Sequence, residues 1–146
     1  MGIEIFGQLL LATILGALIG LEREMKRKQA GLQTYSLVSL GTCLFTLVSI
    51  ELFYSFPVVS NLIFDPSRIV QAIAAGIGFI GAGVIFRQES GLVGLTTAAG
   101  LWTTAAIGVA VGAGFYSLAI FTTFLVILIL VGFGFVEYKF LKKEQN

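Results

Sequence analysis

Long apolar stretches and short polar breaks alternate along this chain. Each apolar stretch is close to the length of about 20 residues that a helix needs to cross a bilayer. The pattern predicts five membrane helices, at Ile3 to Leu21, Leu32 to Phe56, Ile69 to Phe86, Leu92 to Val111 and Phe115 to Val136. We therefore expect an all-α polytopic membrane protein in which residues 1–146 form a single transmembrane domain.

The breaks between the predicted helices have local physical causes. The charged run at residues 22–28 cannot lie in hydrocarbon, and Pro57 ends the second helix. Asp65 and Pro66 suit the N-cap and the first helical position of the third helix. A charged turn at residues 87–91 then separates the third helix from the fourth.

The basic residues indicate how the helices are oriented. Eight of the nine lysines and arginines lie in the first loop, in the turn after the third helix or in the C-terminal tail. Five passes put these three regions on one side of the membrane, and the positive-inside rule makes that side cytoplasmic. The N-terminus is therefore expected outside and the C-terminus inside, with Arg68 as the one basic residue on the outer side.

Composition restricts the chemistry of this chain. Hydrophobic residues make up 57% of it and charged residues 12%, about half the share that is usual in soluble domains. There is no histidine and Cys43 is the only cysteine, which excludes an intrachain disulfide and metal sites built from imidazole or several thiolates. Gly76, Gly78 and Gly81 have the spacing of a dinucleotide-binding fingerprint, but they lie inside a predicted membrane helix. We expect no enzyme activity, no organic cofactor and no nucleic-acid partner.

Small residues recur at the spacing that suits helix packing in membranes. Rows four residues apart occur in the first, fourth and third helices: Gly16 and Gly20, Gly108 and Gly112, and Ala74, Gly78 and Ala82. The threonine pairs at 96–97 and 103–104 lie about two turns apart and stack on one face. Two interpretations stay open for them: hydroxyls bonded to their own backbone, or a hydroxyl-lined seam that contacts an ion, a lipid or a partner helix.

A weak internal echo relates the two halves of the chain. Gly16-Ala17 recurs as Gly81-Ala82, and Gly31-Leu32 recurs as Gly94-Leu95, with a charged turn between the two motifs each time. Two parallel helical hairpins plus one peripheral fifth helix would explain the echo. Chance is the alternative in so glycine-rich a chain.

The acidic residues supply two further candidates. Glu22 and Glu24 lie among four basic residues, so a salt-bridged cap is their simplest interpretation, and the same basic loop can attract anionic lipid headgroups. Asp65 is either a helix N-cap or, together with Glu4 or Glu51, a group that gathers Mg²⁺ at the outer mouth of a path. We expect no charged residue near the bilayer midplane, which disfavours a self-sufficient Mg²⁺ pump.

Six motifs in order resemble the MgtC/SapB family of bacterial inner-membrane proteins, from about Gly16 to Tyr116. The motifs are Gly20-Leu21-Glu22-Arg23-Glu24, Ala30-Gly31-Leu32-Gln33-Thr34, Leu37-Val38-Ser39-Leu40-Gly41, Asp65-Pro66-Ser67-Arg68-Ile69, Gly76-Ile77-Gly78-Phe79-Ile80-Gly81-Ala82-Gly83 and Gly94-Leu95-Thr96-Thr97-Ala98-Ala99. The family usually has arginine where this chain has Gln33, which puts the role of that arginine in doubt here. Many members also carry a C-terminal domain of the ACT type, so this chain resembles the short, membrane-only form.

The resemblance implies a multi-pass protein of the bacterial inner membrane that is linked to growth in low magnesium and to survival of pathogens within macrophages. It also implies inhibition of the F-type ATP synthase through membrane-helix contact. Older labels for the family are Mg²⁺ transporter and transport-ATPase accessory protein.

Two hypotheses follow for function. In the first, a small homodimeric membrane regulator acts on partner membrane proteins through its small-residue faces. In the second, the protein is a channel, carrier or transport accessory subunit for Mg²⁺ or another cation, with Asp65 as a metal ligand. The residues assigned to function are Glu22, Arg23, Glu24, Thr34, Asp65, Arg68, Gly78, Gly81, Thr96 and Thr97.

Overall fold

The computed structural model describes residues 2–55, 65, 67–89, 91–136 and 139. Its elements are α1 (Ile3–Met25), α2 (Leu32–Ser55), α3 (Ser67–Gly83), β1 (Phe86–Gln88), β2 (Gly91–Val93), α4 (Leu95–Gly112), α5 (Tyr116–Leu128), the π-helical turn η1 (Ile129–Phe133) and α6 (Gly134–Val136). Four helical segments are long and apolar enough to cross a membrane, namely α1, α2, α4 and residues 116–133, and α3 is a shorter apolar helix beside them. The prediction of an all-α polytopic membrane protein is confirmed.

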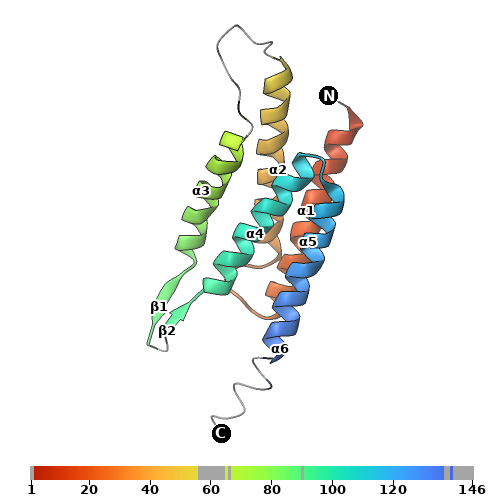
Figure 1. Ribbon diagram of the computed structural model, residues 1–146. Helices are drawn as coiled ribbons and strands as arrows, with labels where there is room; N and C mark the ends of the chain where they lie inside the picture. Colours follow the sequence, from red (N-terminus) through yellow and green to blue (C-terminus); the bar gives the residue numbers. More distant parts are fainter. Residues whose placement is uncertain (1, 56–64, 66, 90, 137–138, 140–146) are drawn as a thin grey trace.

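Successive long helices run in alternating directions (Figure 1). The loop after α1, the β1–β2 hairpin and the end of α6 therefore lie together at one end of the bundle, and we call this the basic end. The start of α1 and the turn between α4 and α5 lie at the opposite end. This arrangement brings the first loop and the charged turn of the sequence to one side, as five passes require.

Two predicted boundaries are wrong because the chain turns at glycines. The third helix ends at Gly83 and not at Phe86, and the fourth begins at Leu95 and not at Leu92. Between them β1 and β2 form an antiparallel hairpin in which Arg87 is opposite Leu92. Backbone φ angles of +121° at Gly91 and +98° at Gly94 lie in the left-handed region, which a right-handed helix cannot contain.

Other boundaries differ as well. Helix α1 continues to Met25, about one turn beyond Leu21, and therefore carries the first charges of the basic run. The fifth helix begins at Tyr116 and passes through a π-helical turn before it ends at Val136. Phe56, Pro57 and Pro66 lie outside the described residues.

Tyr35 of α2 lies at the centre of the bundle and is fully buried. A Cβ added at Gly16 of α1 would lie 2.6 Å from the carbonyl oxygen of Tyr35, and one added at Gly20 would lie 2.9 Å from the Tyr35 Cβ. On the other side, a Cβ at Gly100 of α4 would lie 2.5 Å from the Tyr35 hydroxyl oxygen. That hydroxyl donates a hydrogen bond to the carbonyl oxygen of Thr97, 3.2 Å away. Three glycines thus make room for one large side chain.

The second glycine pair fastens α4 to α2 further along the helices. A Cβ at Gly108 would collide with the Thr42 side chain and with the carbonyl oxygen of Ser39. A Cβ at Gly112 would lie 2.8 Å from the carbonyl oxygen of Cys43. The prediction that the glycine pairs of the first and fourth helices mark close helix contacts is confirmed.

Helices α3 and α5 flank this central trio of α1, α2 and α4. Helix α5 contacts α1 and α4 and buries Ala119, Thr123 and Val126. Ile127 also packs against the core, while most of the other large apolar residues of α5 are exposed. Helix α3 packs mainly on α4 and buries Ile77 and Gly81. The α1–α2 and α3–α4 pairs have the order expected of two hairpins, and the internal repeat itself stays a prediction.

We expect Gly16→Ala to destabilise the bundle, because the added methyl group would meet the backbone of α2 at 2.6 Å. Overpacking of this kind costs about 1–3 kcal/mol of unfolding free energy. The matched control is Gly7→Ala in the same helix, where no atom lies within 4 Å of an added Cβ. Reversible unfolding in mixed detergent micelles measures both changes, and equal stability of the two variants would contradict the packing described here.

Candidate functional site

The structure distributes the predicted functional residues over three regions and does not join them in one site. Glu22, Arg23, Glu24, Thr96 and Thr97 lie at the basic end, on the last turn of α1 and the first turn of α4. Asp65 and Arg68 lie at the start of α3, close to the opposite end. Thr34, Gly78 and Gly81 lie on α2 and α3.

Glu22 forms ion pairs with two cations of its own helix. Its Oε1 atom lies 2.7 Å from Nζ of Lys26, and its Oε2 atom lies 3.4 Å from Nη1 of Arg23. Arg23 is only 3% exposed, which is rare for an arginine. Lys26 Nζ also donates a hydrogen bond to the carbonyl oxygen of Leu130, 3.0 Å away in the π-helical turn. The predicted salt-bridged cap therefore exists for Glu22, and it fixes α1 to the end of the fifth helix.

Glu24 has a different partner from the one that the charge pattern suggests. Its Oε2 atom accepts a hydrogen bond from the backbone N–H of Leu32 at 3.1 Å, so the carboxylate caps the first turn of α2. Gly31 leaves room for this contact, because an added Cβ there would collide with the same carboxylate. Glu24 thus closes the loop between α1 and α2.

The threonine seam on α4 divides between two faces. Thr97 and Thr104, seven residues apart, are buried, whereas Thr96 is exposed. The Thr97 hydroxyl donates to Oε1 of Gln29 at 3.1 Å, and the Thr103 hydroxyl donates to its own backbone at the carbonyl oxygen of Ala99.

The Thr104 hydroxyl has no hydrogen-bond partner within the described part of the chain, and neither does that of Ser39. Bonding to the local backbone therefore explains Thr103, while Thr97 instead ties α4 to the first loop.

Asp65 caps α3, as the sequence predicts. Its Oδ1 atom accepts a hydrogen bond from the backbone N–H of Ser67 at 2.9 Å. Hydrogen bonds from the Ser67 side chain and backbone, and the charge of Arg68, lower the pKa of the Asp65 carboxyl. Within the described ranges no group of three acidic, histidine or cysteine side chains could hold a metal ion. A Mg²⁺ site at Asp65 stays a prediction.

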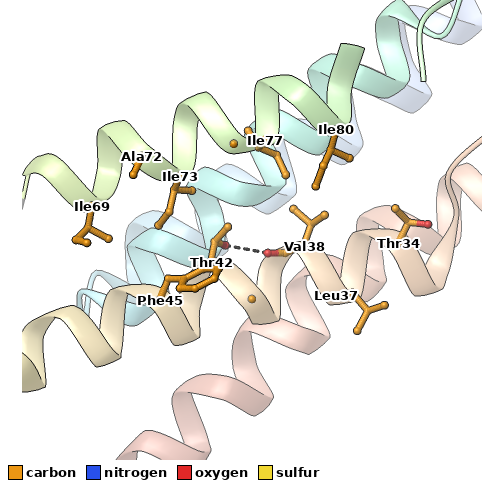
Figure 2. A pocket seen from close by; sticks show the side chains of 12 residues that line it. Thr34, Leu37, Val38, Thr42, Phe45, Ile69, Ala72, Ile73, Ile77 and Ile80 are labelled. Atoms are coloured by element: carbon orange, nitrogen blue, oxygen red, sulfur yellow. Dashed lines mark hydrogen bonds between the residues drawn. The ribbon is translucent and has the colours of Figure 1, made fainter. Parts of the chain in front are cut away.

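A groove of about 650 Å³ separates α2 from α3 (Figure 2). Its walls are apolar except for Thr34 and Thr42: they consist of Thr34, Leu37, Val38, Gly41, Thr42 and Phe45 of α2 and Ile69, Ala72, Ile73, Gly76, Ile77 and Ile80 of α3. Sequence reasoning missed this groove because it arises from the tilt between two helices that each look like ordinary membrane spans.

The glycines of α3 differ from those of α1 and α4. No atom lies within 4 Å of a Cβ added at Gly76, Gly78 or Gly83, and Gly81 alone approaches a neighbour, Ala98 at 3.5 Å. All of them lie within α3, so their spacing creates no phosphate-binding turn. These glycines do not share one face, because Gly76 lines the groove toward α2 and Gly78, two residues further along the helix, points away from it. Gly78 instead lies in a row with Ala74 and Ala82, four residues to either side, and has no intrachain partner in the described structure.

Sequence reasoning also missed Tyr35 and Gln29, both of which join the first loop region to α4. A signal for Tyr35 was available, because a tyrosine buried in a membrane bundle needs a partner for its hydroxyl. The contact of Gln29 with Thr97 has no local signal, since it joins residues that are distant in the sequence.

We expect the pKa of Asp65 to lie below the ordinary aspartate value and to rise toward that value in Ser67→Ala, which removes the side-chain hydrogen bond. The charged cap then stabilises the start of α3 above the ordinary pKa and is lost as pH falls through the lowered one. Titration of the Asp65 carboxyl carbon by NMR in detergent micelles measures the shift. Ser36→Ala is the control, because the Ser36 hydroxyl bonds to its own helix at Leu32. An unchanged pKa in Ser67→Ala would refute the side-chain hydrogen bond from Ser67, while the backbone bond would remain.

Comparison with known proteins gives close relatives over most of this chain. Protein SapB of Bacillus subtilis is 46% identical over 131 residues, which cover 89% of this chain and 56% of SapB. Escherichia coli K12 has a protein described as putative magnesium transporter YhiD, 41% identical over 143 residues, which cover 98% of this chain and 66% of YhiD. Protein MgtC of Salmonella typhimurium is 42% identical over 82% of this chain and 48% of MgtC.

These relatives are longer than the chain described here, which spans between about half and two thirds of their length. No solved structure matches the chain. Residues 9–139 match the MgtC family, a match that includes all of the long helices except the first turns of α1. The chain therefore belongs to the MgtC family.

Proposed function

We propose that this protein is a regulator in magnesium homeostasis that acts within the bacterial inner membrane by helix-to-helix contact with other membrane proteins. One observation carries the proposal, namely the row of small residues Ala74, Gly78 and Ala82 on α3, in which Gly78 has open space around it. The link to magnesium comes from the relative described as a putative magnesium transporter and from the family resemblance.

The contrast between two sets of glycines supports the contact surface. At five glycines, the space that a side chain would occupy is taken by other parts of the same chain. These are Gly16, Gly20, Gly100, Gly108 and Gly112. Gly76, Gly78 and Gly83 have no such neighbour, although glycine in a helix lowers its stability in water by about 1 kcal/mol relative to alanine. In membranes, small residues allow two helices to approach each other closely. The open position at Gly78, in a row with Ala74 and Ala82, suits a helix from outside this chain.

The position of α3 agrees with this use. Helix α3 lies at the edge of the bundle, it contacts α4 more than α2, and its exposed apolar residues include Phe79 at 83% exposure. Exposed apolar residues are ordinary against lipid, so the row of small residues around Gly78 is the feature that distinguishes this helix. We infer that the first partner is a second copy of the chain, and that a membrane helix of the F-type ATP synthase is a further candidate.

We expect Gly78→Leu to abolish self-association, because the leucine side chain would occupy the surface where the partner helix packs. The side chain starts in open space, since no atom lies within 4 Å of a Cβ added at Gly78. Gly7→Leu on α1 is the control, with the same change in size and polarity and the same open space. Chemical crosslinking of the full chain in native membranes measures the dimer, and equal crosslinking of both variants would exclude α3 as the contact.

Cation transport is the second candidate function. The buried hydroxyls of Ser39 and Thr104, which lack partners in the described part of the bundle, are the observation that favours it. Three facts weigh against it: hydroxyls alone are weak ligands for Mg²⁺, the described residues contain no acidic cluster, and each of these hydroxyls is enclosed by packed helices.

We expect no Mg²⁺ flux when the full chain is reconstituted in liposomes that contain a Mg²⁺-sensitive dye. Flux that disappears in Thr104→Val would contradict the regulator proposal, because this substitution keeps the side-chain shape and removes only the hydroxyl. Thr103→Val is the control, since the Thr103 hydroxyl is already bonded to Ala99.

A further inference from the structure

We propose that the basic end contains a binding pocket for a phosphate group, and that its best-suited source is the headgroup of an anionic phospholipid. The pocket lies between the loop after α1, the start of α4 and the end of the fifth helix, and its volume is about 980 Å³. Three cationic side chains line it, those of Arg23, Lys26 and Lys28, and none of the described residues that line it carries a carboxylate.

Arg23 is the side chain that most needs a ligand. It is 3% exposed, its Nε has no hydrogen-bond partner among the described residues, and its nearest anion is Glu22 at 3.4 Å. Lys26 approaches the same carboxylate more closely, at 2.7 Å. The single negative charge of Glu22 cannot balance the positive charges of both Arg23 and Lys26. Lys28 adds a third positive charge to the pocket lining. An anion in the pocket would supply the missing charge to a buried guanidinium.

The start of α4 contributes backbone donors to the same space. Gly94 is the N-cap of this 18-residue helix, and no side chain caps the helix. The first N–H groups of a helix have no partner within it, and together with the helix dipole they favour an anion. Gly94, Leu95 and Thr96 all line the pocket. At the start of α2, in contrast, the carboxylate of Glu24 occupies the corresponding N–H of Leu32.

Another part of the pocket lining is apolar and indicates a lipid. It consists of Ile129, Leu130, Val131, Phe133, Gly134 and Phe135 from η1 and α6. Phe133 of η1 is 67% exposed and Phe135 of α6 is 61% exposed, and α6 lies at the basic end of the bundle. A phosphate with attached glycerol and acyl chains matches a cationic corner beside an apolar wall. Free phosphate matches the corner alone.

Native mass spectrometry of the full chain in uncharged detergent tests the proposal, with phosphatidylglycerol as the lipid probe. Lys28→Gln is the main variant, because Lys28 is exposed and its loss leaves the packing intact. We expect its affinity for phosphatidylglycerol to fall about fivefold, from about 1 kcal/mol per basic residue at a lipid surface. Arg23→Gln is expected to lose at least as much. Arg87→Gln is the matched control, since Arg87 is exposed on the hairpin and does not line the pocket.

A second arm separates the two sources of phosphate. Calorimetric titration with inorganic phosphate, against chloride at equal ionic strength, shows whether the free anion binds and whether Lys28→Gln weakens it. Lysine-dependent binding of the lipid supports the proposal, and such binding of inorganic phosphate alone supports the site with the free anion as its ligand. Equal losses in Lys28→Gln and Arg87→Gln would overturn the proposal, because they indicate general attraction to a charged surface. Absence of both lipid and phosphate binding would overturn it as well.

Discussion

The packing of Tyr35 against three glycines is the constraint on which the rest of the structure depends. Between helices in a membrane the hydrophobic effect is weak, because lipid tails are as apolar as leucine, and close packing with hydrogen bonds must supply the association energy. Gly16 and Gly20 let α1 reach the backbone around Tyr35, and Gly100 lets α4 reach its hydroxyl. The bond to Thr97 satisfies that hydroxyl in the interior. One side chain therefore sets the distances among three helices.

The position of α2 then determines where surfaces remain available. Helix α2 packs against α1 on one side and against α4 on the other. Helix α3 can therefore approach α2 only at an angle, and this angle leaves the groove between α2 and α3. The same packing brings the last turn of α1 beside the first turn of α4, where Arg23 is buried. The groove and the proposed phosphate pocket are thus consequences of one packing arrangement.

The sequence predicted the helices and the glycine contacts well because both depend on local spacing. The lengths of the apolar stretches located the membrane helices. The glycine pairs Gly16/Gly20 and Gly108/Gly112 marked contacts between helices. The hairpin at residues 86–93 was missed, since its apolar residues resemble a continuing helix and its left-handed glycines are visible only in three dimensions. The burial of Arg23 was missed for a related reason. A run of charges predicts a solvated surface, and only the approach of the fifth helix covers this one.

The β1–β2 hairpin gives this arrangement a mechanical consequence. The hairpin is a short and tightly packed connection between α3 and α4, because Gly94 packs directly against the carbonyl group of Val84. The strand β2 and Gly94 also form part of the wall of the basic-end pocket. A partner helix that moved α3 along its axis would therefore displace that wall and change the affinity of the pocket. Thermodynamic linkage makes the effect mutual, so occupancy of the pocket would change the affinity of α3 for its partner by the same factor.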